Sequence, residues 1–203
     1  PVPGDQMQNQ SSQWLNVRRD RPDYMIMWGW GAMTPTAVKE AAKIRYDMEK
    51  LIGVWWSGGE DDARPAGDGA KGFKTLNFNA VGQDFPVIQD IQTYVVDKNM
   101  SQVSDKSRVG ENLYNRGVMN SFLMAEAIRK AQKMTGKTVI DAADMRAGME
   151  NLDITEARLK EAGMEGFMAP LKLSCEDHSG ENDVYVQQWD GKTWQKVSDW
   201  FAP

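Results

Sequence analysis

Two short apolar runs, each followed closely by glycine, constrain the fold of this chain most. The first run is Tyr24–Trp28 and the second is Leu51–Trp56. An unbroken apolar run of this length is typical of a strand buried on both faces, because polar residues alternate only where one face meets water. The two runs therefore predict two neighbouring strands in the interior of a sheet.

Helical patterns lie before and between these two runs. A mostly polar segment, Asp5–Arg19, precedes the first run and suits an exposed helix. Thr34 followed by Pro35 indicates the start of a second helix, with Thr34 as the cap, continuing to about Tyr46. The order helix, strand, helix, strand predicts an α/β fold with parallel strands and crossover helices.

The rest of the chain changes from helical to β. The clearest helix is Tyr114–Met134, for which we expect one apolar face formed by Val118, Phe122, Ala125 and Ile128. Asp190-Gly191 is a turn pair that favours a hairpin between the strands on either side of it. Further expected elements are strands at 73–78, 171–173, 184–186 and 194–197, helices at 87–95 and 141–150, and a loop or short helix at 61–72.

Composition excludes several classes of protein. The chain has 203 residues, with 24 Lys+Arg against 29 Asp+Glu and 41% hydrophobic residues, which suits one globular domain or two small ones. Net acidity without a basic cluster argues against a nucleic-acid partner, because phosphate contacts need concentrated positive charge. No apolar run approaches the roughly 20 residues that span a bilayer, so we expect no membrane insertion.

Catalytic and metal chemistry has little support in the sequence. Cys175 is the single cysteine and His178 the single histidine, and they form half of a zinc motif with no second pair. We therefore predict no catalytic residues, no metal and no cofactor. The chain begins Pro1-Val2-Pro3-Gly4, as a mature exported protein or a trimmed chain would.

Several segments occur in an order that points to a known family. They are Asp23-Tyr24 followed by Met-Ile-Met-Trp-Gly-Trp-Gly, Gly53-Val54-Trp55-Trp56, Gly69-Ala70-Lys71-Gly72-Phe73, Tyr114-Asn115-Arg116-Gly117 and Gly166-Phe167-Met168-Ala169-Pro170. Together they resemble the periplasmic solute-binding proteins of branched-chain amino acid type ABC importers, which have the type I periplasmic binding protein fold. The resemblance covers nearly the whole chain.

The resemblance implies a two-lobe fold of which this chain is the carboxy-terminal half. Residues 1–78 and 165–203 would form most of the second lobe, a three-layer α/β/α domain, and residues 80–160 the helical remainder of the first lobe. The amino-terminal strands of the first lobe would be absent. In the family those strands carry the loops that hold the ligand's carboxylate.

Tryptophans follow both buried runs, where a ligand is expected. Ligands of open α/β sheets bind beyond the carboxyl ends of the strands, and four Trp side chains there suit an aromatic solute. The alternative is that these rings pack beneath the crossover helices. The predicted ligand-binding residues, with two added by the resemblance, are Trp28, Gly29, Trp30, Trp55, Trp56, Ser57, Tyr114 and Arg116.

The resemblance also bears on the solute. The acidic residue that receives the amino group in the family's amino-acid binders has no clear equivalent, since Glu60 comes a few residues late. This favours a carboxylate without an α-amino group. Arg116 can pair with such a carboxylate through two parallel hydrogen bonds, or it can be a solvated charge at a helix end.

Two functions follow from these patterns. The first is a non-enzymatic, truncated periplasmic solute-binding protein that captures a small aromatic carboxylate, closes about the strands near Gly72–Asn79 and serves an ABC permease. The alternative is a homodimeric interaction or signalling module that has lost solute capture. It arises because removing half a lobe leaves sheet edges uncovered, and a second copy can cover them.

Overall fold

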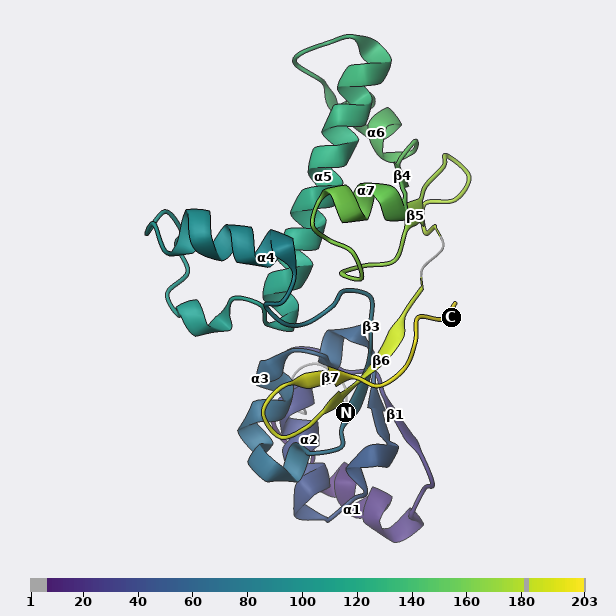
Figure 1. The fold of residues 1–203 in the computed structure, drawn as a ribbon. Helices are drawn as coiled ribbons and strands as arrows, with labels where there is room; N and C mark the ends of the chain where they lie inside the picture. Colours follow the sequence, from purple (N-terminus) through teal and green to yellow (C-terminus); the bar gives the residue numbers. More distant parts are fainter. Residues whose placement is uncertain (1–6, 181–182, 203) are drawn as a thin grey trace. The chain divides into compact units, whose positions relative to one another are not determined.

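The chain folds into two compact units. The computed structural model describes residues 7–180 and 183–202. Unit 1 is Pro1–Asn77 with Val184–Trp200, and unit 2 is Phe78–Asp183 with Phe201–Pro203. The chain therefore passes between the units three times. Figure 1 shows the elements of each unit, and each unit is described by itself below.

Unit 1 is built on a five-stranded sheet with the order β1-β2-β3-β6-β7. The first three strands are parallel, and β6 and β7 continue the sheet antiparallel. The predicted parallel sheet with a closing hairpin is thus confirmed. The strands are β1 (Met25–Met27), β2 (Leu51–Gly53), β3 (Lys74–Asn77), β6 (Tyr185–Trp189) and β7 (Trp194–Lys196).

The first predicted strand differs from the structure in its burial. β1 lies at the edge of the sheet, and 75% of the Ile26 side-chain surface is exposed. The flanking Tyr24 and Trp28 are exposed as well. The prediction of burial on both faces was wrong for this strand, because a run of apolar residues does not reveal whether other elements cover both faces of the sheet at that point. β2 lies between two strands and buries Leu51 as expected.

Helix α2 (Met33–Lys43) connects β1 to β2 and packs through Val38 and Ala41, which are fully buried. The prediction that Thr34 caps this helix was wrong. Thr34 lies within the helix, where its hydroxyl contacts Ser57 in the interior. The helix ends at Lys43 rather than near Tyr46. The other helical segments of unit 1 are α1 (Ser11–Asp20), η2 (Met48–Lys50), η3 (Trp55–Ser57), α3 (Glu60–Ala63) and η4 (Arg64–Ala70).

The hairpin between β6 and β7 turns at the predicted Asp190-Gly191 pair. The Asp190 carboxylate accepts hydrogen bonds from the backbone N–H groups of Lys192 and Thr193, both at 2.8 Å. These bonds, that from Thr193 above all, hold the pKa of Asp190 below its usual value. Gly191 adopts φ 107°, a conformation that L side chains rarely adopt.

Unit 2 is mainly helical, with one small antiparallel sheet formed by β4 and β5. Its core draws on residues from across the unit, including Ile88, Met119, Leu159 and Phe167. Its elements are α4 (Pro86–Ile91), η5 (Gln92–Val96), η6 (Lys106–Arg108), α5 (Asn112–Thr135), α6 (Ala142–Met149), β4 (Asp153–Ile154), α7 (Glu156–Glu161) and β5 (Leu171–Lys172).

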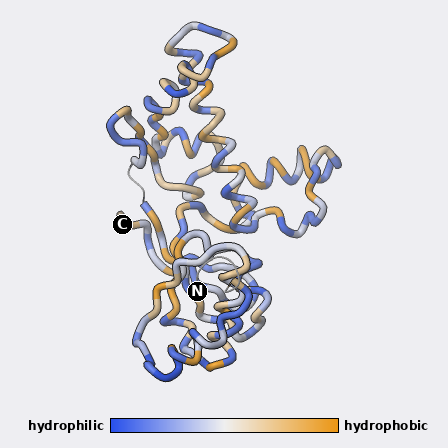
Figure 2. The backbone as a smooth tube through the Cα atoms, turned by 180° about the vertical axis from the view of Figure 1, so that it is seen from behind, coloured by the Kyte–Doolittle hydropathy of each residue, from blue (hydrophilic) through white to orange (hydrophobic). Residues whose placement is uncertain are grey.

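Residues 165–183 belong to unit 2, whereas the sequence assigned 165 onward to the other lobe. Phe167 packs its ring edge-on against Phe85 at 5.0 Å, and its carbonyl accepts a hydrogen bond from the Ala80 N–H at 2.7 Å. These contacts place the segment in the core of the helical unit. Figure 2 shows that apolar stretches in both units are short and separated by hydrophilic ones.

The long helix α5 matches its predicted range, but only part of the predicted apolar face is buried: Val118 and Phe122 pack against the core, whereas Ile128 is exposed. It buries Asn115, Met119, Ala127 and Ala131, whereas Ala125 is exposed. The small residues face α6, where the backbone comes so close that a Cβ on Gly148 would lie 2.3 Å from the Ala127 carbonyl oxygen. Close helix packing therefore selects small residues where α5 meets α6.

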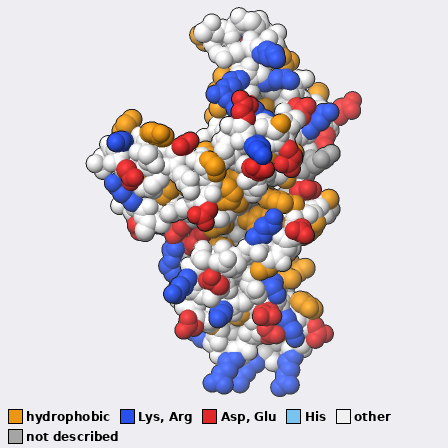
Figure 3. All heavy atoms as spheres, viewed as in Figure 1, with side chains coloured by type: hydrophobic (Ala, Val, Ile, Leu, Met, Phe, Trp, Pro, Cys, Tyr) orange, Lys and Arg blue, Asp and Glu red, His pale blue; other side chains and the backbone are white. Residues whose placement is uncertain are grey.

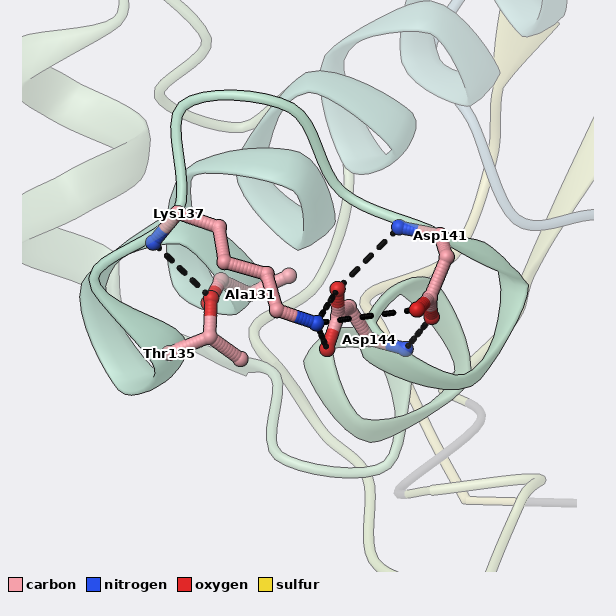
Figure 4. Close-up of polar contacts among 5 residues, drawn as sticks. All are labelled: Ala131, Thr135, Lys137, Asp141 and Asp144. Atoms are coloured by element: carbon pink, nitrogen blue, oxygen red, sulfur yellow. Dashed lines mark hydrogen bonds and ion pairs between the residues drawn. The ribbon is translucent and has the colours of Figure 1, made fainter.

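The connection from α5 to α6 is fixed by a local polar cluster (Figure 4). Asp141 caps α6 by accepting from the Asp144 N–H at 2.9 Å, and the Asp144 carboxylate accepts from the Asp141 N–H at 3.1 Å. Lys137 reaches across the turn and donates to Asp144 at 2.7 Å. The cluster satisfies the backbone N–H groups at the start of the helix, so we assign it a structural role.

The close approach of α5 and α6 generates a stability prediction. We expect Gly148→Ala to lower the free energy of unfolding by about 1–3 kcal/mol, because the new methyl group must push the helices apart. Gly117→Ala is the matched control in α5, since no other atom lies within 4 Å of the added Cβ. It should raise stability by about 0.5–1 kcal/mol, and urea titration measures both changes. Equal effects of the two substitutions would contradict the packing argument.

A charge pair ties α7 to α5. Arg158 donates from Nε and from a terminal nitrogen to the two oxygens of Glu126, at 3.1 and 2.9 Å. Only 12% of the Glu126 side chain is exposed, and the hydrogen bonds from Arg158 hold its pKa below the usual value. A lowered pKa in the folded state means that the ionised carboxylate stabilises the fold.

The pair gives this contribution a defined pH dependence. Above the ordinary glutamate pKa of about 4.3, Glu126→Gln should cost about 1–2 kcal/mol of unfolding free energy. The difference between wild type and variant should shrink as pH falls through the lowered folded-state pKa, where the wild type also protonates. Glu161→Gln removes the exposed partner of the same arginine, 3.0 Å away, and should cost under about 0.5 kcal/mol. A pH-independent difference for Glu126→Gln would refute the assignment.

Candidate functional site

Four tryptophans form one aromatic cluster in unit 1. Trp55 and Trp56 pack at 5.2 Å between ring centroids, Trp28 lies 6.1 Å from each of them, and Trp30 lies 5.7 Å from Trp56. Most of these pairs are edge-to-face, an arrangement that the electrostatics of aromatic rings favours. Trp28, Trp30 and Trp56 remain 62%, 42% and 45% exposed. The cluster therefore presents aromatic surface to solvent instead of forming a core.

The parallel pairing of β1 and β2 positions this cluster. Met27 at the end of β1 pairs with Gly53 at the end of β2, so the segments that follow leave the same edge of the sheet. Trp28 and Trp30 follow the first strand, and Trp55 and Trp56 lie in the short helix η3 after the second. This is the edge at which ligands of open α/β sheets bind.

Hydrogen bonds in the interior hold the two loops together. The Ser57 hydroxyl donates to the Gly29 carbonyl at 2.9 Å, and Thr34 lies 3.4 Å from the same hydroxyl. Both Ser57 and Thr34 are fully buried. Two of the predicted ligand-binding residues, Gly29 and Ser57, thus link the loops that carry the tryptophans.

Glu60 also lies near these loops in sequence, in the first turn of α3, and it is only 4% exposed. Its carboxylate is therefore not part of the exposed surface that the tryptophans form. The geometry thus adds no reason to include Glu60 in the candidate site.

Tyr114 and Arg116 belong to unit 2, at the start of α5. The Arg116 Nε donates to the Asn79 side-chain oxygen at 3.0 Å, and its guanidinium lies 4.5 Å from the centre of the Phe78 ring. Tyr114 is half-buried, and this burial raises the pKa of its hydroxyl. The arginine is thus oriented by two contacts within its own unit.

A group of buried asparagines around Arg116 was not predicted from the sequence. Asn79 donates to the Asn112 side chain at 2.9 Å, and Asn115 donates to the Ala80 and Gly82 carbonyls, both at 3.0 Å. All three asparagines are fully buried. The Asn115 side-chain oxygen has no hydrogen-bond partner in the part of the chain that the structure describes. Asparagine near a helix start is common, so sequence alone gave no reason to single these residues out.

Other candidate sites find no support within residues 7–180 and 183–202. No group of three or more His, Cys, Asp or Glu there can hold a metal ion. Cys175 is exposed, and His178 lies 3.2 Å from the Glu150 carboxylate. None of the helices in the described ranges is long and apolar enough to cross a membrane.

Basic side chains gather at one end of unit 1 in Figure 3, but they do not form a continuous positive surface. Arg18, Arg45 and Lys50 line a shallow groove there together with the acidic Asp23 and Asp47. Nucleic-acid binding needs concentrated positive charge, so this mixed surface gives no support to such a partner.

Comparison with known proteins places these features in a family. The model of the periplasmic binding protein family matches residues 1–193. A crystal structure from the Pseudomonas fluorescens group, described as an ABC transporter permease, is 39% identical with a TM-score of 0.90, covering 98% of this chain and 48% of that one. No curated protein matches.

Two more distant structures share the fold. A branched-chain amino acid ABC transporter protein from Thermus thermophilus with bound valine has a TM-score of 0.77 at 17% identity, covering 100% of this chain and 51% of that one. A solute-binding protein from R. palustris in complex with benzoate has a TM-score of 0.66 at 14% identity, covering 97% and 49%. The chain thus spans about half the length of the structures it matches.

Proposed function

Because this chain belongs to the periplasmic binding protein family, we propose that it acts as the solute-binding component of an ABC importer in the periplasm. In this role it captures a solute and delivers it to a permease without catalysing a reaction. The observation that carries the proposal is the exposed cluster of Trp28, Trp30, Trp55 and Trp56 at the carboxyl ends of β1 and β2.

We propose a small aromatic carboxylate as the solute. An aromatic ring placed against the tryptophans gains edge-to-face or stacking contacts in addition to the burial of its apolar area. A relative of the same fold from R. palustris is in complex with benzoate, which supports this class of ligand. Glu60 is buried, so the exposed cluster offers no acidic partner from that position for an α-amino group.

Arg116 is the residue we assign to the carboxylate, with Tyr114 beside it. A guanidinium binds a carboxylate through two parallel hydrogen bonds, and the contacts of Arg116 with Asn79 and Phe78 fix its orientation.

Ligand binding by matched solutes tests the proposal. We expect benzoate to raise the thermal midpoint and quench tryptophan fluorescence, and cyclohexanecarboxylate and valine to do so at least ten-fold less effectively. Trp28→Ala should weaken benzoate binding at least ten-fold without lowering the midpoint of the free protein by more than about 2 °C, because the ring is largely exposed. Isothermal titration calorimetry gives the dissociation constants.

Tyr94→Ala is the matched control, because this aromatic residue is 66% exposed and lies in unit 2 outside the predicted site. It should leave benzoate binding unchanged. If Trp28→Ala unfolds the chain, the tryptophans are structural. If neither benzoate nor any other aromatic carboxylate binds, this chain does not capture the proposed solute class.

The second candidate is a homodimeric interaction module, and exposed apolar residues on α5 favour it. Leu113 and Met124 are each 58% exposed, and Ile128 is 36% exposed. A second copy that covers such residues should give a mass near twice 22.9 kDa by sedimentation equilibrium at micromolar concentration. A mass of one chain across the micromolar range would exclude the module.

A further inference from the structure

A charged groove lies at the amino ends of β1 and β2, whereas the tryptophan cluster follows their carboxyl ends. Asp23 lies just before β1, and Asp47 precedes the short helix η2, which leads directly into β2. Residues at the C-terminal ends of α1 and α2 line the groove as well, and its volume is about 410 Å³. The groove therefore belongs wholly to unit 1 and is separate from the surface that we assign to the solute.

Three arginines in the lining of this groove have no acidic partner. Arg18, Arg21 and Arg45 are exposed, and among residues 7–180 and 183–202 none of them has an ion-pair partner. One of the two carboxylates in the lining, that of Asp47, lies 3.8 Å from the Lys50 ammonium. The groove thus carries excess positive charge, although the net charge of the chain is −5. Such a lining is complementary to a ligand that carries several carboxylates.

The backbone at Arg21 and Arg45 argues against helix capping as the only role of these arginines. Both residues adopt a left-handed conformation, with φ 49° and 59°, where α1 and α2 end. Glycine is the usual residue at such a position, because a side chain there incurs a steric cost. Two arginines in this conformation at one groove therefore indicate that their side chains have a function.

The lining of the groove favours a polypeptide as its ligand. It includes the apolar Val17 and Ile44 beside the charged residues, and a polypeptide segment offers both kinds of side chain. The Tyr46 hydroxyl donates to the Pro22 carbonyl at 3.3 Å, so the segments that follow α2 and α1 are held together. Lipid headgroups and nucleic-acid backbones instead require clustered positive charge. Asp23 interrupts the positive charge of this groove.

We propose that this groove binds an acidic polypeptide segment of a partner protein. Carboxylates of the segment pair with the guanidinium groups of Arg18, Arg21 and Arg45, each of which can donate two parallel hydrogen bonds. Asp23 repels a uniformly anionic ligand and so contributes to specificity. The proposal does not depend on solute capture, since the tryptophans lie at the other ends of the same strands.

Binding of a short acidic peptide tests the proposal. We expect fluorescein-labelled oligoglutamate to bind the wild-type chain in a fluorescence anisotropy titration, and oligoglutamine of the same length to bind about ten-fold more weakly. Arg21→Gly and Arg45→Gly should each weaken oligoglutamate binding about five-fold. The same two substitutions should raise the thermal midpoint by about 2 °C, because glycine adopts the left-handed conformation without steric cost. Arginines that served only the helix ends would give a lower midpoint.

Arg19→Ala is the matched control, because Arg19 is an exposed arginine of the same helix that pairs with Asp20 and does not line the groove. It should leave oligoglutamate binding unchanged. Asp23→Asn should tighten this binding about three-fold, because it removes a carboxylate that repels the peptide. The proposal is overturned if the wild-type chain does not bind oligoglutamate, if neither glycine variant weakens binding, or if both lower the midpoint. Binding of phosphatidylglycerol vesicles but not of the peptide would assign the groove to a membrane surface and overturn it too.

Discussion

The parallel pairing of β1 with β2 is the constraint on which the candidate site depends. It brings Met27 and Gly53, the last residues of the two strands, to one edge of the sheet. Gly53 ends β2 in a space where a Cβ would lie 2.8 Å from the Ser57 side chain and 3.1 Å from Phe73. Only glycine fits there without displacement, so the chain can turn at once and return Ser57 to the Gly29 carbonyl. The tryptophans then face solvent because the smaller residues beside them fill the interior.

Patterns along the chain predicted the elements well and their surroundings less well. The order of strands and helices, the long helix α5, the helix expected at 141–150 and the hairpin at Asp190-Gly191 all follow from local periodicity and turn chemistry. Whether β1 is an edge or an interior strand depends on neighbours far away in sequence. Local patterns carry no information on that, and the prediction failed at Ile26.

The candidate site shows the same division between local and long-range information. The Trp pairs were found because they follow apolar runs, which is a local signal. The roles of Thr34 and Ser57 were not found, since Thr-Pro is a common helix start and only the folded chain brings the two hydroxyls together. The apolar face of α5 was predicted only in part for a related reason. Helix packing at Gly148 selects small residues, whereas periodicity arguments favour large ones.

Buried asparagines flank Phe78, one in each unit, and both are held by hydrogen bonds. Asn77, buried in unit 1, donates to Gln187 at 3.0 Å, and Gln187 in turn donates to Thr75 at 2.9 Å. Asn79, buried in unit 2, donates to Asn112 and accepts from Arg116. Breaking either set of hydrogen bonds would leave buried polar groups without partners, which is costly. Asn79, at the end of the segment that leads out of unit 1, is therefore part of the hydrogen-bond network that orients Arg116.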